Sequence, residues 1–279
     1  QDQQGTLVIL LKSAKPGIAV IVGDGVRYEI ADQVATELEK HCKVDRKVML
    51  AGMPSETEHN MSALYLDSDK VLAVHKDREQ ALTAATGKNI VYKKLDSLSY
   101  VDKVDYLVLT YKDIDSAGEE LQMGALKLFE EFERLLVEKI RQLLGMGYRE
   151  VHLVTDHGFV LTGLLEEADK ISADATGKKD VGERFIRTVE KQSHPHWVGF
   201  AESYGEYSYV YAAKNHRPFK SKGGYGYSHG GFTPQEIILP KFTFRKEKPA
   251  TDGLAVAVIN KQELADVVGD NFAIKLQAA

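Results

Sequence analysis

The sequence has little of several features that mark whole classes of protein. Cys42 is its one cysteine among 279 residues, which excludes a disulfide framework and predicts a reducing, cytoplasmic setting. It has no apolar run near the roughly 18 residues that a membrane-spanning helix needs, so we expect no membrane partner. Residues 1–17 lack the basic start and cleavage pattern of a signal peptide. Since the chain does not begin with methionine, we expect it to be a piece of a longer protein.

The sequence also lacks a strong excess of either charge. Its formal net charge is -5 and charged residues make up 28% of it. This balance excludes a surface built as a whole for nucleic acid or for an anionic membrane. Nucleic-acid binding would need a local patch, and residues 214–222, with Lys214, Arg217 and Lys220, are a candidate that is equally well interpreted as a solvated loop.

What the sequence does contain is an alternation of strand and helix patterns. Short apolar segments typical of strands occupy residues 17–22, 47–51, 105–110 and 151–155. Helical patterns follow at residues 28–41, beyond 53–55, at 77–85 and at 121–146. This alternation predicts an α/β fold, a three-layer sandwich with a mostly parallel central sheet.

The second half of the chain is richer in strand patterns. Residues 197–213, with many tyrosines and valines, predict a hairpin, and residues 253–279 alternate apolar and polar side chains. We therefore expect a main domain over residues 1–250 and the start of a small β-rich C-terminal extension over residues 251–279.

Metal-binding residue types follow the predicted strands. Asp24 follows the first strand, Asp115 the third, and Asp156 and His157 the fourth. Because the carboxyl ends of parallel strands open onto one edge of a sheet, these side chains are expected to converge. Carboxylate and imidazole together suit zinc or a similar ion. Each residue has a simpler alternative, since an aspartate after a strand often caps a helix and His229 can be an ordinary loop residue.

Five stretches of the chain resemble a known family. They are VIVGDGVRYEIA at 20–31, MPSETEHNMSAL at 53–64, DIDSAGEE at 113–120, VHLVTDHGFV at 151–160 and YSHGGFTPQEIILP at 227–240. Their order is similar to that of the PglZ domain of the alkaline-phosphatase superfamily, found in bacterial phage-defence (BREX) systems. The resemblance implies an alkaline-phosphatase-like fold, hydrolysis of phosphoesters, an antiviral role and other phage-defence proteins as partners.

The resemblance also implies roles for individual residues. Two divalent ions, zinc or alternatively manganese, would be held by the following residues: Asp24, Thr57, Asp115, Glu119, Asp156, His157 and His229. Thr57 matches the nucleophile, with Ser55 as the alternative. Glu119 stands where relatives in the phosphodiesterase branch have histidine, which puts the affinity for the second ion in question. Arg27 and Asn60 are candidate substrate-binding residues, although Arg27 is equally well interpreted as a helix-surface residue.

The substrate is expected to be a phosphodiester, on a nucleotide or a nucleic acid. Monoesterases surround the phosphate with additional positive groups, and the matched motifs show no extra lysine of that kind. The rival hypothesis is a binding module of a multi-protein defence assembly with a weak or inactive site, for which the Glu119 departure is the main support.

Overall fold

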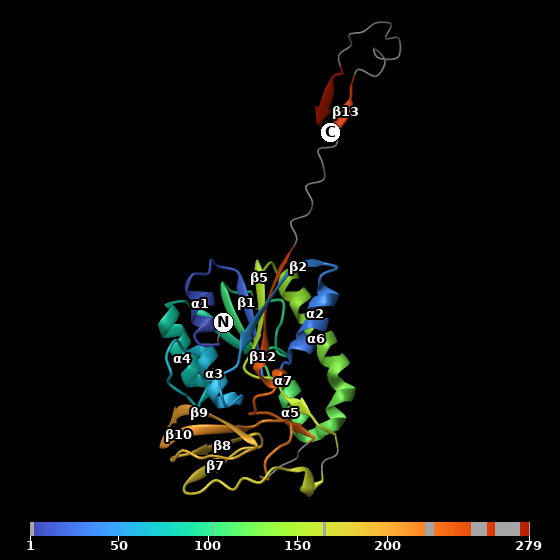
Figure 1. Cartoon of the computed structure of the whole chain (residues 1–279). Coiled ribbons are helices and arrows are strands. Elements are labelled where there is room, and N and C mark those ends of the chain that lie inside the picture. The colour runs from blue at the N-terminus through green and yellow to red at the C-terminus, as the bar shows by residue number, and fades with distance from the viewer. Residues whose placement is uncertain are drawn as a thin grey trace. The chain divides into compact units, whose positions relative to one another are not determined.

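The structure is a computed structural model that describes residues 3–101, 103–163, 166–220, 226–246, 256–259 and 274–278. The chain divides into two compact units, Gln1–Arg245 and Lys246–Ala279 (Figure 1). The predicted boundary between residues 250 and 251 lies outside the described residues. Within the second unit, β13 (Val256–Val258) pairs antiparallel with β14 (Leu276–Ala278), as the alternating pattern predicted.

The centre of the first unit is a six-stranded sheet. Its order is β2 (Cys42–Leu50), β12 (Ile238–Lys246), β5 (Glu150–Thr155), β1 (Ile18–Gly23), β4 (Tyr106–Tyr111) and β3 (Ile90–Lys94). Strands β5, β1, β4 and β3 are parallel, and β12 is antiparallel to β5. All six residues of β1 are buried, as expected of a central strand covered on both faces.

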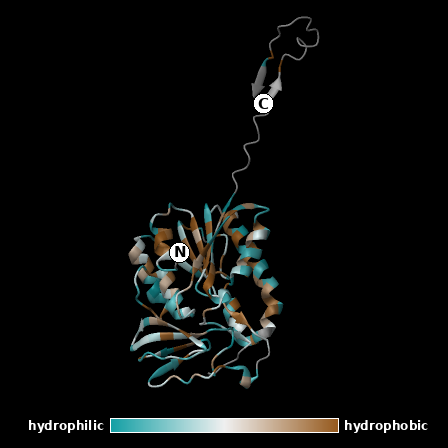
Figure 2. Cartoon of the chain, viewed as in Figure 1, coloured by the Kyte–Doolittle hydropathy of each residue, from teal (hydrophilic) through white to brown (hydrophobic). Residues whose placement is uncertain are grey.

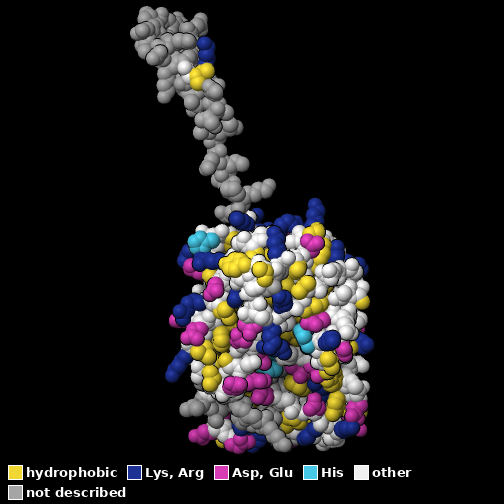
Figure 3. All heavy atoms as spheres, turned by 180° about the vertical axis from the view of Figure 1, so that it is seen from behind, with side chains coloured by type: hydrophobic (Ala, Val, Ile, Leu, Met, Phe, Trp, Pro, Cys, Tyr) yellow, Lys and Arg dark blue, Asp and Glu magenta, His cyan; other side chains and the backbone are white. Residues whose placement is uncertain are grey.

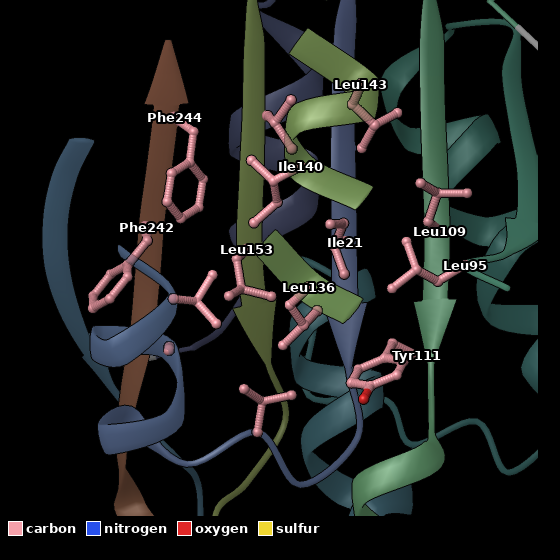
Figure 4. Close-up of a cluster of buried hydrophobic side chains, with 14 of the residues drawn as sticks. Ile21, Leu95, Leu109, Tyr111, Leu136, Ile140, Leu143, Leu153, Phe242 and Phe244 are labelled. Atoms are coloured by element: carbon pink, nitrogen blue, oxygen red, sulfur yellow. The ribbon is translucent and has the colours of Figure 1, made fainter. Parts of the chain in front are cut away.

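Helices cover both faces of this sheet and complete the three predicted layers. One face packs against α2 (Tyr28–Leu38) and α6 (Phe129–Gly145). The other packs against α1 (Thr6–Lys12), α3 (Thr57–Tyr65) and α4 (His75–Thr86). Leu136, Ile140 and Leu143 of α6 lie along one helical stripe over the sheet (Figure 4). Apolar residues gather in the sheet and polar ones face outward (Figure 2).

Three sequence predictions differ from the structure. The helix predicted over residues 121–146 is not continuous, because its first part is the 3-10 helix η1 (Gln122–Leu128), which lies between α5 (Asp113–Leu121) and α6. The chain breaks at Gln122, whose φ of 52° is incompatible with a continuous helix. Strand β3 was missed because only three apolar residues precede Lys93. Strand β12 was missed because Pro240 interrupts its apolar pattern, which argues against an internal strand.

A second sheet is built from the segment between β5 and β12. Its order is β7 (Lys179–Val181), β8 (Phe185–Thr188), β10 (Tyr207–Ala213) and β9 (Trp197–Tyr204), and its paired strands are antiparallel. The hairpin predicted over residues 197–213 is thus confirmed. Ile186, Trp197 and Phe219 form the centre of its own small core.

The remaining elements of the first unit are short. They are β6 (Val160–Leu161), which pairs with β11 (Tyr227–Ser228), the 3-10 helix η2 (Glu167–Asp169) and α7 (Pro234–Ile237). On the face shown in Figure 3, basic and acidic side chains are interspersed. Among the described residues, no helix has both the length and the apolar character needed to cross a membrane.

Candidate metal centre

The carboxyl ends of β1, β4 and β5 meet at one edge of the central sheet, where the predicted residues converge. Asp24 follows β1, and its backbone N–H donates to the carbonyl of Tyr111 at the end of β4 (2.8 Å). Asp156 and His157 follow β5, and Thr57 is the first residue of α3. Asp115 lies in the first turn of α5 and His229 follows β11.

Asp24, Asp156 and His157 form a first group, whose ligand atoms all lie within 4.8 Å of one another. All three side chains are buried. Thr57 joins them, because its Oγ1 lies 3.3 Å from Asp24 Oδ1 and 3.0 Å from His157 Nε2. The predicted nucleophile therefore lies directly against two of the predicted ligands.

Asp156 has one carboxylate oxygen satisfied and one orphaned. Its Oδ1 accepts hydrogen bonds from the backbone N–H groups of Gly25 (3.2 Å) and His157 (2.8 Å). Its Oδ2 is buried without a hydrogen-bond partner. Burial, followed by the nearby charges of Asp24 and Asp115, raises the pKa of Asp156 well above its usual range. An orphaned buried oxygen beside two further carboxylates is the arrangement that a cation would satisfy.

His157 turns its Nε2 toward the same point. Its Nδ1 lies 2.9 Å from the carbonyl oxygen of Gly158, and since a carbonyl only accepts, Nδ1 donates this bond. Nε2 faces Thr57, Asp24 and Asp156. This backbone contact fixes the tautomer that metal-binding histidines use.

Asp115, His157 and His229 form a second group within the same 4.8 Å limit. The rings of His157 and His229 are stacked, with centroids 4.1 Å apart and planes 13° from parallel. Tyr227 donates its hydroxyl to Asp115 Oδ1 (2.8 Å). The aromatic ring of Tyr227 lies so close to Gly118 that a Cβ there would approach it to 2.2 Å. The glycine in the Asp115 motif is therefore required by the packing of this ligand's partner.

Glu119 lies outside both groups. It is exposed on α5, and burial, followed by the charge of Asp115, raises its pKa. Its role as a ligand remains a prediction, and it requires the side chain to move toward Asp115.

The loop that carries His229 is held by a buried ion pair. Arg184 donates from Nε and Nη2 to the two carboxylate oxygens of Glu236, each at 3.0 Å, and both side chains are fully buried. Glu236 also accepts from the backbone N–H of Gly231 (2.8 Å) and, as part of a capping box, from Thr233. Because five donors converge on one carboxylate, residues 229–236 have a single well-defined course.

Three residues that the sequence offered for the site, Asn60, Arg27 and Ser55, make other contacts in the structure. Asn60 is buried, and its amide bonds to the backbone of Gly52 (2.7 Å) and Pro54 (2.9 Å), so the geometry argues against direct contact with a substrate. Arg27 pairs with Glu29 and lies over the ring of Phe159. The Ser55 hydroxyl donates to the carbonyl of Gly231 (2.7 Å), which ties it to the His229 loop. The hydrogen bonds that Asn60 and Arg27 make are therefore with neighbouring residues of their own loops and helix.

Two charged residues at the site were missed by the sequence reasoning. Lys112 Nζ lies 3.5 Å from Asp24 Oδ2, and it was missed because it lies one residue before the matched motif at 113–120. Its signal was its place directly after a strand. Burial, as the largest cause, raises the pKa of Glu183 to about 7. The charges of His229, Glu119 and Asp115 also act on its carboxylate. No pattern in the sequence marks Glu183, because it reaches the site only through the second sheet.

The donor set fits divalent ions of the zinc type. Asp24, Asp156 and His157 with the Thr57 hydroxyl form one set of oxygen and nitrogen ligands, and Asp115 with His229 forms another. Such mixed carboxylate and imidazole sets are typical of zinc and manganese sites in hydrolases.

Comparisons with known proteins identify the family and the fold. The model of the BREX system PglZ alkaline phosphatase-like domain matches residues 66–244, a range that contains Asp115, Asp156, His157 and His229. An alkaline phosphatase-like protein PglZ from Bacillus cereus (strain H3081.97) is 24% identical over 267 residues, which cover 83% of this chain. The chain spans only 31% of that relative's length.

Solved structures share the fold. Human ectonucleotide pyrophosphatase/phosphodiesterase 5 superposes with a TM-score of 0.56 at 12% identity, over 82% of this chain and 89% of that one. The murine protein, in an inactive threonine-to-alanine variant in complex with AMP, gives 0.55 at 10% identity, over 81% and 87%. The mostly parallel sheet with helices on both faces is therefore an alkaline-phosphatase-like fold. On the family match and the fold together, the chain belongs to the PglZ family of alkaline phosphatase-like domains.

Proposed function

We propose that this domain hydrolyses phosphoesters, with Thr57 as the nucleophile. Two divalent ions would be held in two places: Asp24, Thr57, Asp156 and His157 for one, and Asp115, Glu119 and His229 for the other. The observation that carries the proposal is the position of Thr57 Oγ1, within hydrogen-bond distance of both Asp24 and His157 and beside the orphaned oxygen of Asp156.

When bound, the ions would lower the pKa of the Thr57 hydroxyl and stabilise the charge on the phosphoryl oxygens. The chain's own contribution is orientation. Thr57 opens α3, where the free N–H groups and the helix dipole favour an anionic phosphoryl group. Its oxygen bonds to phosphorus while the ester oxygen leaves and the hydroxyl proton passes to solvent. Water then cleaves the phosphothreonine and restores the hydroxyl.

The comparisons support the class of substrate. The murine structural relative is a named phosphodiesterase with AMP bound, and its inactive form lacks a threonine. A nucleotide or another phosphoester is accordingly the substrate that we infer, and the BREX family name supports phage-defence proteins as partners.

The experiment is metal content by elemental mass spectrometry, paired with hydrolysis of p-nitrophenyl phosphate and bis-p-nitrophenyl phosphate in the presence of zinc or manganese. We expect Thr57→Ala to retain metal and to lose turnover by at least ~1,000-fold, because no nucleophile remains. Thr176→Ala, at an exposed threonine of the second-sheet region, is the matched control and retains wild-type turnover. Full activity in Thr57→Ala would refute the assignment of the nucleophile.

One observation favours a second candidate, a binding module without turnover. Glu119 is exposed and lies outside both ligand groups, so the second ion has only two firm side-chain ligands of its own, apart from the shared His157. A folded wild-type protein that takes up no metal under any loading condition and cleaves neither ester would decide for the module.

A further inference from the structure

Lys112 brings a positive charge to the proposed centre from the residue after β4. Its Nζ lies 3.5 Å from Asp24 Oδ2, whereas Oδ1 of the same carboxylate faces Thr57 and His157. The ammonium group therefore contacts the Asp24 oxygen that faces neither Thr57 nor His157. The side chain is 56% exposed, so an incoming substrate can reach it.

Other cations near the centre are held by partners of their own. Arg78, whose charge acts on Asp156 and Asp24, is buried and donates to the carbonyls of Leu72 and Ala73. Arg184 is bound by Glu236, Arg187 by Glu56 and Glu202, and Arg27 by Glu29. In the part of the chain that the structure describes, Lys112 is the one lysine or arginine whose ion pair includes a member of the two ligand groups. Its backbone is fixed as the N-cap of α5, where Ser116 N–H donates to its carbonyl (3.1 Å), and its flexible stem leaves the ammonium free to approach a ligand.

The charge of Lys112 would add to the charges of the proposed ligands and ions, which balance one another. Asp24, Asp115, Asp156 and Glu119 together carry as many negative charges, when ionised, as two divalent ions carry positive ones. A phosphodiester is a monoanion, whereas a phosphate monoester has a second pKa near 6 and is mostly a dianion at neutral pH. A cation that is left over at such a centre stabilises the dianion more than the monoanion.

We propose that Lys112 is a specificity-determining residue that directs this site toward dianionic substrates, phosphate monoesters or terminal phosphate groups, in preference to diesters. The proposal rests on the proposed hydrolase function and names its substrate class. It reverses the preference for diesters drawn from the sequence, because that preference considered only the matched motifs, and Lys112 lies just outside the motif at 113–120.

The first test compares two substrates in the metal-loaded protein. We expect Lys112→Gln to lower kcat/KM about 10-fold for p-nitrophenyl phosphate and less than about 3-fold for bis-p-nitrophenyl phosphate. The reason is that the dianion loses a stronger charge contact than the monoanion does. Lys94→Gln is the matched control, since it removes the same charge at the end of the neighbouring strand β3 without touching Asp24, and it should change neither value. Lys112→Arg keeps the charge and should retain the wild-type ratio of the two substrates.

A second test does not depend on turnover. In the Thr57→Ala background, calorimetric titration with inorganic phosphate, largely a dianion at pH 8, is compared with dimethyl phosphate, a monoanion. We expect Lys112→Gln to weaken phosphate binding about 10-fold and to leave dimethyl phosphate within about 3-fold. An equal effect on both ligands, or on neither, would overturn the proposal. A wild-type protein that cleaves neither ester would contradict the hydrolase instead, and the titration would still decide the role of Lys112.

Discussion

The buried pair of Arg184 and Glu236 offers a quantitative test of how the His229 loop is held. Glu236→Gln keeps the size of the side chain and therefore opens no cavity. It retains one oxygen for the bonds from Arg184 Nε and Gly231 N–H, but its amide nitrogen cannot accept the three bonds that Oε2 receives from Arg184 and Thr233. It also leaves the fully buried guanidinium of Arg184 without its counter-charge.

The expected cost is about 3–5 kcal/mol in the free energy of unfolding, the usual penalty for breaking a buried ion pair on one side. Urea unfolding followed by circular dichroism measures this as a shift in midpoint with an unchanged slope. Glu206→Gln is the matched control: Glu206 pairs with Lys178 on the surface, and exposed pairs contribute little, so its midpoint should not change.

A second variant tests the physical reason. Replacing both partners, as Arg184→Met with Glu236→Met, removes the unpaired charge and should cost less than Glu236→Gln alone. A loss below about 1 kcal/mol in Glu236→Gln would refute the reasoning, because it would mean that the guanidinium finds water or another acceptor in place of the carboxylate.

Three further outcomes are expected, each measured by urea unfolding. Gly118→Ala should destabilise the fold by about 1–3 kcal/mol, since its Cβ meets the Tyr227 ring at 2.2 Å. Gly145→Ala, with open space around it, is the control and should be neutral or stabilising. Equal effects of the two substitutions would contradict the packing argument. Arg187→Met should lower the free energy of unfolding by about 2–4 kcal/mol, because the buried Arg187 binds Glu56 and Glu202 and these partly buried carboxylates would lose their cation. An unchanged free energy of unfolding would show that these ion pairs add nothing to stability. Burial by itself raises the pKa of Glu236, but the Arg184 charge and the hydrogen bonds outweigh it and lower the pKa below 4.5. The stabilisation is therefore present above pH 4.5 and lost as the pH falls through the lowered pKa, so acid should destabilise the wild type more than Glu236→Gln, and parallel pH profiles would contradict this.

The fold was predictable because its strands are short, apolar and followed by polar residues. The segments containing β1, β4 and β5 could be recognised as buried parallel strands, and the place of Asp24, Asp156 and His157 at one sheet edge follows from that alone. The edge strand β3 and the proline-interrupted β12 could not be recognised, since their stability comes from neighbours that are distant in sequence.

Positions of individual polar atoms were not predictable. Asn60 and Arg27 are close in sequence to Thr57 and Asp24, yet Asn60 bonds to its own loop and Arg27 pairs with Glu29. Lys112 looked like an ordinary residue after a strand, yet it contacts Asp24. Side-chain direction depends on the local backbone and on packing, and sequence spacing does not fix it.

The layered α/β fold, the residue types of the candidate metal centre and their order could be inferred from the sequence, because strand patterning and strand ends are local properties of the chain. The tertiary structure alone decided which atoms meet: the contact of Thr57 with His157 across 100 residues, the stacking of His229 on His157, and the charge that Lys112 adds beside Asp24. Those contacts join segments far apart in the chain, and only the packing of the sheets and helices brings them within a few ångströms.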